Sequence, residues 1–283
     1  MSQISFPGLG IPEFNLNRVF LQIGNFTVYW YGIIICLGIV LGFAVGYMRM
    51  KRLGVTLDDL SDYVLICVPS AIVGARLYYV LAELENYTSF YDVLAVWQGG
   101  LAIYGGIIAG ALSFVFVCKY KKKAVLKMCD AASPGLILGQ IIGRWGNFFN
   151  AEAFGSASTY EFFGRKFDIS SLSNSNPLRM TINGELVHPT FLYESLWNLC
   201  GFVLMNVFFK KKAFDGEVLL WYLSWYGLGR CVIEGLRTDS LTSGTVRISQ
   251  LLALLCFVAG TVTIIVIRVK KSVKGNKENG SNN

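Results

Sequence analysis

Residues 134–155 read "PGLILGQIIGRWGNFFNAEAFG", in which an apolar run leads directly into an arginine, two asparagines and a glutamate. The apolar part suits lipid, where a charged side chain costs several kcal/mol unless it is paired or hydrated. The run therefore predicts a membrane span, and the polar residues at its end predict a site.

The rest of the chain has the same character. Hydrophobic residues make up 54% of the 283 residues, charged residues 15%, and the mean hydropathy is +0.51. Such values are outside the range of soluble globular proteins. Stretches that could cross a bilayer, about 20 residues each, lie at 28–48, 62–82, 98–118, 129–149, 189–209, 216–236 and 247–267. We expect an all-α polytopic membrane protein with seven transmembrane helices.

Basic clusters predict the orientation, because lysine and arginine in short loops stay on the cytoplasmic side of a membrane. The clusters follow the first, third, fifth and seventh spans, at 49–52, 119–123, 210–212 and 268–274. We therefore expect the N-terminus outside and the C-terminus in the cytoplasm. The polar residues after span four then face the outer leaflet.

The segments between and around the spans divide the chain further. Residues 1–27 are expected to form an outer-surface arm, in which "VFLQIGNFTVYW" suggests a hairpin. Spans one to four occupy 28–149, a small external head segment occupies 150–187, and spans five to seven occupy 188–268. A cytoplasmic tail, 269–283, completes the chain.

Charge and cysteine usage exclude some partners. The net charge of +7 comes from short clusters that border apolar runs, which argues against nucleic acid. The seven cysteines lie in or beside spans without paired spacing, so we interpret them as small core residues. No metal or other cofactor is indicated.

The polar residues after span four are spaced so that they would share one face of a helix. If the helix continued, four residues would fall within an arc of about 140°: Arg144, Asn147, Glu152 and Gly155. A lone arginine here has two equally weighted roles. It either pairs with a carboxylate that pins the bundle or binds an anionic ligand from the outer leaflet.

A second arginine-bearing stripe lies in "WYGLGRCVIEGLR" at 225–237. Tyr226, Arg230, Glu234 and Arg237 recur there at four- and three-residue spacing, which places them on one helix face. An ion pair between Arg230 and Glu234 would not account for Tyr226 and Arg237 in the same stripe. Two arginine-bearing faces toward one leaflet suggest a shared anion, and the planar guanidinium suits the phosphate of a phospholipid headgroup.

Other polar residues favour structural roles. Arg76, inside span two, is expected to pair structurally, and His188, the single histidine, to cap or anchor span five. The glycines around Tyr104 in "GGLAIYGG" suit close helix packing, or would leave room for an acyl chain. Tyr31 lies at the outer interface, where aromatic residues usually anchor a span, so position alone gives it no site role.

Four motifs together resemble the prolipoprotein diacylglyceryl transferase family: "GRWGNFFNAEAFG", "HPTFLYES", "GGLAIYGG" and "YGLGRCVIEGLR". The resemblance spans about residues 28–250. It implies transfer of the diacylglyceryl group from phosphatidylglycerol to the lipobox cysteine thiol of a prolipoprotein, with formation of a thioether and release of glycerol phosphate. The implied partners are phosphatidylglycerol, lipobox signal peptides and the bilayer, and the implied location is the bacterial cytoplasmic membrane.

The resemblance also implies site residues. We expect catalytic roles for Arg144, Arg230, Tyr104 and Glu152, and substrate contacts from Arg144, Asn147, Tyr31, Asn150, Gly155, Tyr226 and Glu234. Many members carry a histidine where this chain has Tyr104. Either the base lies elsewhere, or Tyr104 has a positioning role.

Three other classes of protein compete with this interpretation. A lipid or solute transporter would use the same arginines for an anion, but typically shows repeat symmetry and broken helices, which this sequence lacks. A structural membrane protein would not need polar faces on two spans. An alcohol phosphatidyltransferase would need an aspartate-rich metal motif, and none occurs in the sequence.

Overall fold

The computed structural model describes residues 1–24, 26–87, 89–239, 242–243 and 246–280. It contains two compact units, one formed by Met1–Gly46 and Asp130–Asn283 and the other by Tyr47–Cys129. Each unit is described by itself.

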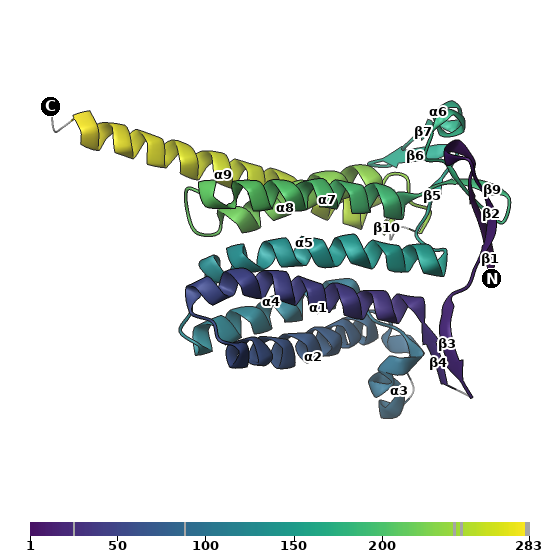
Figure 1. Ribbon diagram of the computed structural model, residues 1–283, viewed down its shortest axis with the longest axis horizontal. Coiled ribbons are helices and arrows are strands. Elements are labelled where there is room, and N and C mark those ends of the chain that lie inside the picture. The colour runs from purple at the N-terminus through teal and green to yellow at the C-terminus, as the bar shows by residue number, and fades with distance from the viewer. Residues whose placement is uncertain (25, 88, 240–241, 244–245, 281–283) are drawn as a thin grey trace. The chain divides into compact units, whose positions relative to one another are not determined.

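The first unit holds most of the helices (Figure 1). They are α5 (Val125–Asn150, from Asp130 on), α7 (Thr190–Phe208), α8 (Glu217–Ile233), α9 (Ile248–Gly280) and most of α1 (Trp30–Met50). Glycines allow α1 and α5 to approach closely, since a Cβ atom on Gly42 would lie 2.8 Å from the carbonyl oxygen of Gly135. Any larger side chain at Gly42 would push the two helices apart.

Asp130 fixes the start of α8. Its buried carboxylate accepts the backbone N–H groups of Gly216, Val218 and Leu219 at 2.8, 2.9 and 3.1 Å, and it pairs with Lys212 at 2.9 Å. The first N–H groups of a helix have no partner within the helix, and its N-terminus favours negative charge. Asp130 therefore holds α8 to α5 at the end of the bundle away from the β-sheet (Figure 1).

A five-stranded sheet covers the other end of these helices, in the order β2-β1-β8-β9-β5. It combines β1 (Ser2–Phe6) and β2 (Ile11–Leu16) from the N-terminal arm with β5 (Gly155–Ser156), β8 (Met180–Ile182) and β9 (Glu185–His188) from the head segment. Antiparallel pairing of Ile4 with Ile182 joins the two segments. The arm and the head segment are thus one layer, which the sequence did not predict.

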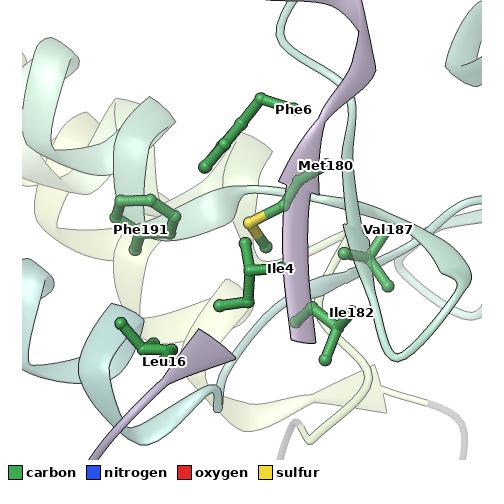
Figure 2. Close-up of a cluster of buried hydrophobic side chains, with 7 residues drawn as sticks. All are labelled: Ile4, Phe6, Leu16, Met180, Ile182, Val187 and Phe191. Carbon is green, nitrogen blue, oxygen red and sulfur yellow. The ribbon is translucent and has the colours of Figure 1, made fainter. Parts of the chain in front are cut away.

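Apolar side chains from this sheet pack against the start of α7 (Figure 2). The cluster consists of Ile4, Phe6, Leu16, Met180, Ile182, Val187 and Phe191. Each strand alternates its side chains between two faces, so one face of the sheet supplies the apolar layer. The cluster fastens the sheet to the helix that carries Glu194.

Shorter elements complete the first unit. They are the 3-10 helices η1 (Pro7–Leu9) and η5 (Phe209–Lys211), α6 (Ser170–Ser175), and the hairpins β3–β4 (Val19–Ile23, Phe26–Tyr29), β6–β7 (Thr159–Phe162, Arg165–Asp168) and β10–β11 (Thr242–Ser243, Val246–Arg247). The hairpin predicted from "VFLQIGNFTVYW" is confirmed by the antiparallel pairing of β3 and β4.

The second unit is built on α2 (Leu57–Ala82) and α4 (Ile103–Tyr120). A Cβ atom on Gly74 would lie 2.7 Å from the carbonyl oxygen of Gly105, so the packing role expected for the glycines beside Tyr104 is confirmed. Arg76 donates to backbone carbonyls of Asp92 and Val93, at 2.5 and 2.9 Å, and also to those of Gly99 and Gly100. These bonds stabilise the connection between α2 and α4, which contains η3 (Leu84–Asn86), α3 (Phe90–Leu94) and η4 (Val96–Gln98). The short helix η2 (Lys51–Leu53) precedes α2.

Within the residues that the structure describes, six helical segments are long and apolar enough to cross a membrane. They are Trp30–Leu53, Leu57–Ala82, Ile103–Tyr120, Val125–Asn150, Thr190–Lys211 and Ile248–Lys274. The remaining expected span, 216–236, falls on α8, which has 17 residues and carries Glu217 and Arg230. A polytopic, mostly helical protein is confirmed, and the crossing by α8 stays a prediction.

Candidate functional site

Two arginines from different helices share one carboxylate. Arg144 on α5 places Nη2 2.5 Å from Oε1 of Glu194, and Arg230 on α8 places Nη1 3.1 Å from Oε2 of Glu194. Glu194 lies on α7, and only 2% of its side chain is exposed. Each oxygen of this buried carboxylate faces a different guanidinium, so α5, α7 and α8 are tied together at one point.

Arg230 also has a second anionic partner. Its Nη2 lies 2.5 Å from Oε2 of Glu234, one helical turn later. The predicted Arg230–Glu234 ion pair is therefore confirmed. Together Arg144, Glu194, Arg230 and Glu234 form the group that we call the arginine cluster.

A polar chain extends from the arginine cluster to the end of α5. Arg144 Nη1 donates to Asn147 Oδ1 at 3.3 Å, and Asn147 Nδ2 donates to Glu152 Oε1 at 2.9 Å. The helical projection does not hold as far as Glu152, because α5 ends at Asn150. Ala151 and Ala153 have φ of 48° and 56°, and this left-handed backbone turns the chain back toward Asn147.

Two tyrosines border this group. The Tyr226 phenol, one turn before Arg230 on α8, interacts electrostatically with Glu194, Arg230 and Arg144. Tyr31, at the start of α1, interacts in the same way with Glu152 and Arg144. The structure thus brings both predicted tyrosines to the residues around Arg144.

Each guanidinium in this region already has a carboxylate partner without a ligand. Two guanidiniums, of Arg144 and Arg230, lie with three carboxylates, of Glu194, Glu234 and Glu152. Such pairing is what allows charged side chains inside an apolar bundle, where an isolated charge is strongly disfavoured. An incoming anion must therefore take guanidinium contacts from a carboxylate.

Other predicted residues have different environments. Arg237 pairs with the exposed Asp239 at 2.9 Å, so it is not part of the arginine cluster. Asn150 is the half-buried last residue of α5. Gly155, in β5, is packed so tightly that a Cβ atom would lie 2.9 Å from Cβ of His188. Tyr104 lies in the first turn of α4, in the second unit.

No role was predicted from the sequence for Glu194, which joins the two arginines, or for Arg247. A carboxylate inside an apolar span is a signal by itself, and Glu194 in "HPTFLYES" had that signal. Arg247 donates to the backbone carbonyls of Glu234 and Arg237 and to Glu161 Oε2 at 3.2 Å. It holds the segment that follows α8, and nothing in the local sequence pointed to that contact.

His188 is the centre of a buried network in the sheet. Its Nε2 lies 2.7 Å from Ser173 Oγ, which donates onward to the Ile169 carbonyl, and its Nδ1 lies 3.0 Å from the Tyr193 hydroxyl. Asn176 Nδ2 donates to that hydroxyl. Since the Ser173 hydroxyl donates elsewhere, it accepts from Nε2–H of His188, and the Tyr193 hydroxyl donates to Nδ1. The ring is therefore assigned as neutral with its proton on Nε2. The predicted anchoring role of His188 is confirmed.

This network predicts a pH-dependent stability. Burial lowers the pKa of His188 below its ordinary value of 6.5, so the folded protein binds a proton there less readily than the unfolded chain does. The free energy of unfolding should therefore fall as pH drops below about 6.5 toward the folded-state pKa of His188. Above pH 6.5 the contribution of His188 should not change with pH. Thermal unfolding between pH 7.5 and 5.5 measures the effect, and His188→Gln should flatten it. If the stability of His188→Gln still fell with pH as in wild type, the pH dependence would belong to other groups.

In the described part of the chain, no three His, Cys, Asp or Glu side chains gather closely enough to hold a metal ion.

Apolar helices of membrane-spanning length, with charged residues paired inside them, define a polytopic membrane protein. Comparison with known proteins then gives the family: the Prolipoprotein diacylglyceryl transferase family matches residues 18–266. The chain belongs to this family.

Named relatives agree with this match. The chain is 46% identical over 264 residues to phosphatidylglycerol–prolipoprotein diacylglyceryl transferase 1 of Clostridium perfringens, covering 92% of this chain and 98% of that protein. Enzymes named phosphatidylglycerol–prolipoprotein diacylglyceryl transferase from Bacillus cereus and Limosilactobacillus reuteri are 44% and 42% identical. These alignments cover 89% and 90% of this chain and 93% and 92% of the relatives.

Proposed function

We propose that this protein transfers the diacylglyceryl group from phosphatidylglycerol to the lipobox cysteine of a prolipoprotein, the first step of lipoprotein maturation. Family membership supports the reaction. The observation that carries the assignment of a site is the pair of guanidiniums, Arg144 and Arg230, on either side of Glu194.

In the proposed site the two arginines bind the phosphodiester of phosphatidylglycerol. A guanidinium offers paired N–H donors that match phosphate oxygens, and hydrogen bonds between charged groups are the strong ones. When the phosphate enters, it replaces Glu194 as the group between Arg144 and Arg230. Glu194 then returns to the arginines when the product leaves, so neither guanidinium is unpaired in the empty site.

The bond changes follow from this placement. The thiolate sulfur of the lipobox cysteine attacks the carbon of the diacylglyceryl group that bears the phosphate. A carbon–sulfur bond forms there, and the bond from this carbon to the phosphate oxygen breaks. The bonding electron pair leaves with glycerol phosphate, whose developing charge Arg144 and Arg230 stabilise. Asn147 orients Arg144 by accepting its hydrogen bond, and Glu152 in turn holds Asn147.

The nucleophile must be a thiolate. A free thiol has a pKa near 8.5, and nearby cations lower it, so two arginines reduce the need for a strong base. The thiol proton must still leave to an acceptor before or during attack. In our proposal Tyr104 positions substrate, and Tyr31, Asn150, Gly155, Tyr226 and Glu234 line or support the binding site.

A conservative substitution tests the role of Tyr104. We expect Tyr104→Phe to retain transfer within about tenfold of wild type, because loss of a general base would cost about 10²–10⁴-fold. The measurement is the initial rate of peptide modification in detergent. A loss in the larger range would make the phenol the proton acceptor, provided that Tyr104→His, which restores a titratable ring, recovers the rate.

The proposed topology has seven spans, with α8 as the sixth, the N-terminus outside and the C-terminus in the cytoplasm. The basic clusters at 49–52, 119–123, 210–212 and 268–274 support it. The arm, 1–27, and the head, 150–187, then lie outside the bacterial cytoplasmic membrane, and the arginine cluster faces the outer leaflet. Prolipoprotein signal peptides reach the same leaflet during export.

A defined reaction tests the function. Purified protein is mixed with phosphatidylglycerol and a synthetic lipobox peptide, and the peptide mass is followed. We expect a gain that matches one diacylglyceryl group, with a peptide carrying serine in place of cysteine left unmodified. Bound lipid without any change in peptide mass would instead favour a transporter that uses the arginines for binding alone.

A further inference from the structure

The hairpin β6–β7 ends in a tight and unusual tip. Residues 162–167 read "FFGRKF", and Phe162 pairs with Arg165 across a two-residue turn. Both turn residues, Phe163 and Gly164, have positive φ, 46° and 81°. This is the turn that matches the twist of a two-stranded hairpin, so the tip has a defined shape.

One face of this hairpin is aromatic. Side chains alternate along a strand, which puts Tyr160 and Phe162 on one face together with Phe167, the cross-strand partner of Tyr160. The Tyr160 ring centroid lies 6.3 Å from that of Phe162 and 6.4 Å from that of Phe167. Phe162 and Phe167 are 39% and 49% exposed, so their outer surfaces are not covered by the described chain.

Hydrogen bonds fix the hairpin beside the first turn of α9 (Figure 1). The Phe163 N–H donates to Gln250 Oε1 at 3.0 Å, and the Glu161 N–H donates to the Gly235 carbonyl at 2.8 Å. Gly235 has no side chain, which lets the Tyr160 ring pack directly on it. The tip is therefore held at one place on the bundle.

That place adjoins a surface suited to lipid. The start of α9, which belongs to a candidate membrane span, exposes Ile248, Leu251 and Leu252 by 39%, 45% and 41%. The exposed rings of Phe162 and Phe167 belong to the hairpin that is hydrogen-bonded to this turn. Aromatic rings are enriched where a protein surface passes from the acyl region to the headgroups.

The tip is also basic. Arg165 and Lys166 are exposed, and the two nearest carboxylates in the hairpin are engaged elsewhere. Glu161 pairs with Arg247 at 3.2 Å, and Asp168 accepts the N–H and hydroxyl groups of Ser170 at 2.9 and 2.6 Å. Two cations next to an apolar face suit an anionic lipid surface.

We infer that the tip of β6–β7 inserts Phe162 and Phe167 into the headgroup region beside α9, where Arg165 and Lys166 bind anionic phospholipid headgroups. The charge of the tip, its exposed aromatic rings and its attachment to the first turn of a candidate membrane span select this partner. The inference rests on the membrane-spanning helix and the hairpin contacts, and not on the transfer reaction. It makes the hairpin a contact that recruits anionic lipid next to the segment that follows Arg230.

Photocrosslinking of the full chain in vesicles tests the inference. p-Benzoylphenylalanine replaces Phe167, or Phe162 in a second variant, and Leu172 on α6 in the control. Leu172 is a matched position because it is an apolar residue of the head with 63% exposure. The vesicles contain equal amounts of phosphatidylglycerol and phosphatidylethanolamine and no peptide, and adducts are identified by mass.

The expected result is lipid adducts at position 167 or 162 and few at 172, with phosphatidylglycerol enriched about threefold over its share of the vesicle. R165Q together with K166Q should remove that enrichment. Adducts at 167 and 162 no more frequent than at 172, or adducts without preference for phosphatidylglycerol, would overturn the inference. So would replacement of the lipid adducts by peptide adducts when lipobox peptide is added.

Discussion

Arg144→Ala is expected to reduce diacylglyceryl transfer by about 10²–10³-fold, the usual effect of removing one donor from a developing oxyanion. In the proposed site Arg144 is one of two groups that bind the phosphate, and it reaches Glu194 at 2.5 Å and Asn147 at 3.3 Å in the free protein. The measurement is the initial rate of peptide mass gain at saturating lipid. Arg144→Lys keeps the charge but not the paired donors, and should recover part of the rate.

The control for this prediction is Arg18→Ala. Arg18 is exposed between β2 and β3 and does not belong to the arginine cluster, so its loss should leave transfer nearly unchanged. Both variants must reach the membrane in wild-type amounts. Near-wild-type transfer by Arg144→Ala would remove Arg144 from the chemistry and leave it a structural partner of Glu194.

Glu194→Ala is expected to lower the free energy of unfolding by about 3–5 kcal/mol, the cost of leaving a buried charge unpaired. Glu194 is 2% exposed and is the partner of both arginines, so its loss leaves Arg144 without its ion pair and Arg230 with Glu234 alone. Thermal unfolding of the protein in detergent measures the change. Addition of phosphatidylglycerol should restore more stability to this variant than to wild type, because the phosphate fills the place of the carboxylate.

Asp239→Asn is the matched control for Glu194→Ala. It removes the carboxylate from another arginine pair, Asp239 with Arg237, in which Asp239 is 47% exposed. Exposed pairs contribute about 0–1 kcal/mol, so little change is expected. Equal destabilisation by both substitutions would contradict the account of Glu194 as the buried link between α5, α7 and α8.

The sequence predicted the helices because their signal is local. Apolar runs of membrane length mark α1, α2, α4, α5, α7 and α9 whatever their neighbours are. The joining of β1 to β8 was not predictable, because the two strands lie far apart in the chain and each is only a few residues long. Short apolar runs do not identify their pairing partner.

The candidate site likewise contains contacts that local sequence predicts and contacts that it does not. Spacing along α8 was enough to predict the Arg230–Glu234 pair, since it lies within one helical turn. A helical projection placed Asn147 and Glu152 on one face, but their hydrogen bond forms because the chain reverses at Ala151 and Ala153 instead of continuing as a helix. The role of Glu194 depends on three helices meeting, which no single stretch of sequence contains.

The central claim is that Arg144 and Arg230 act together on one phosphate, and a double-mutant cycle tests it most directly. Transfer rates are measured for wild type, Arg144→Ala, Arg230→Ala and the double variant in the same lipid. We expect the double variant to be little slower than the slower single variant, because groups that act as a unit are strongly non-additive. Losses that multiply in the double variant would contradict the claim, because the two arginines would then act independently.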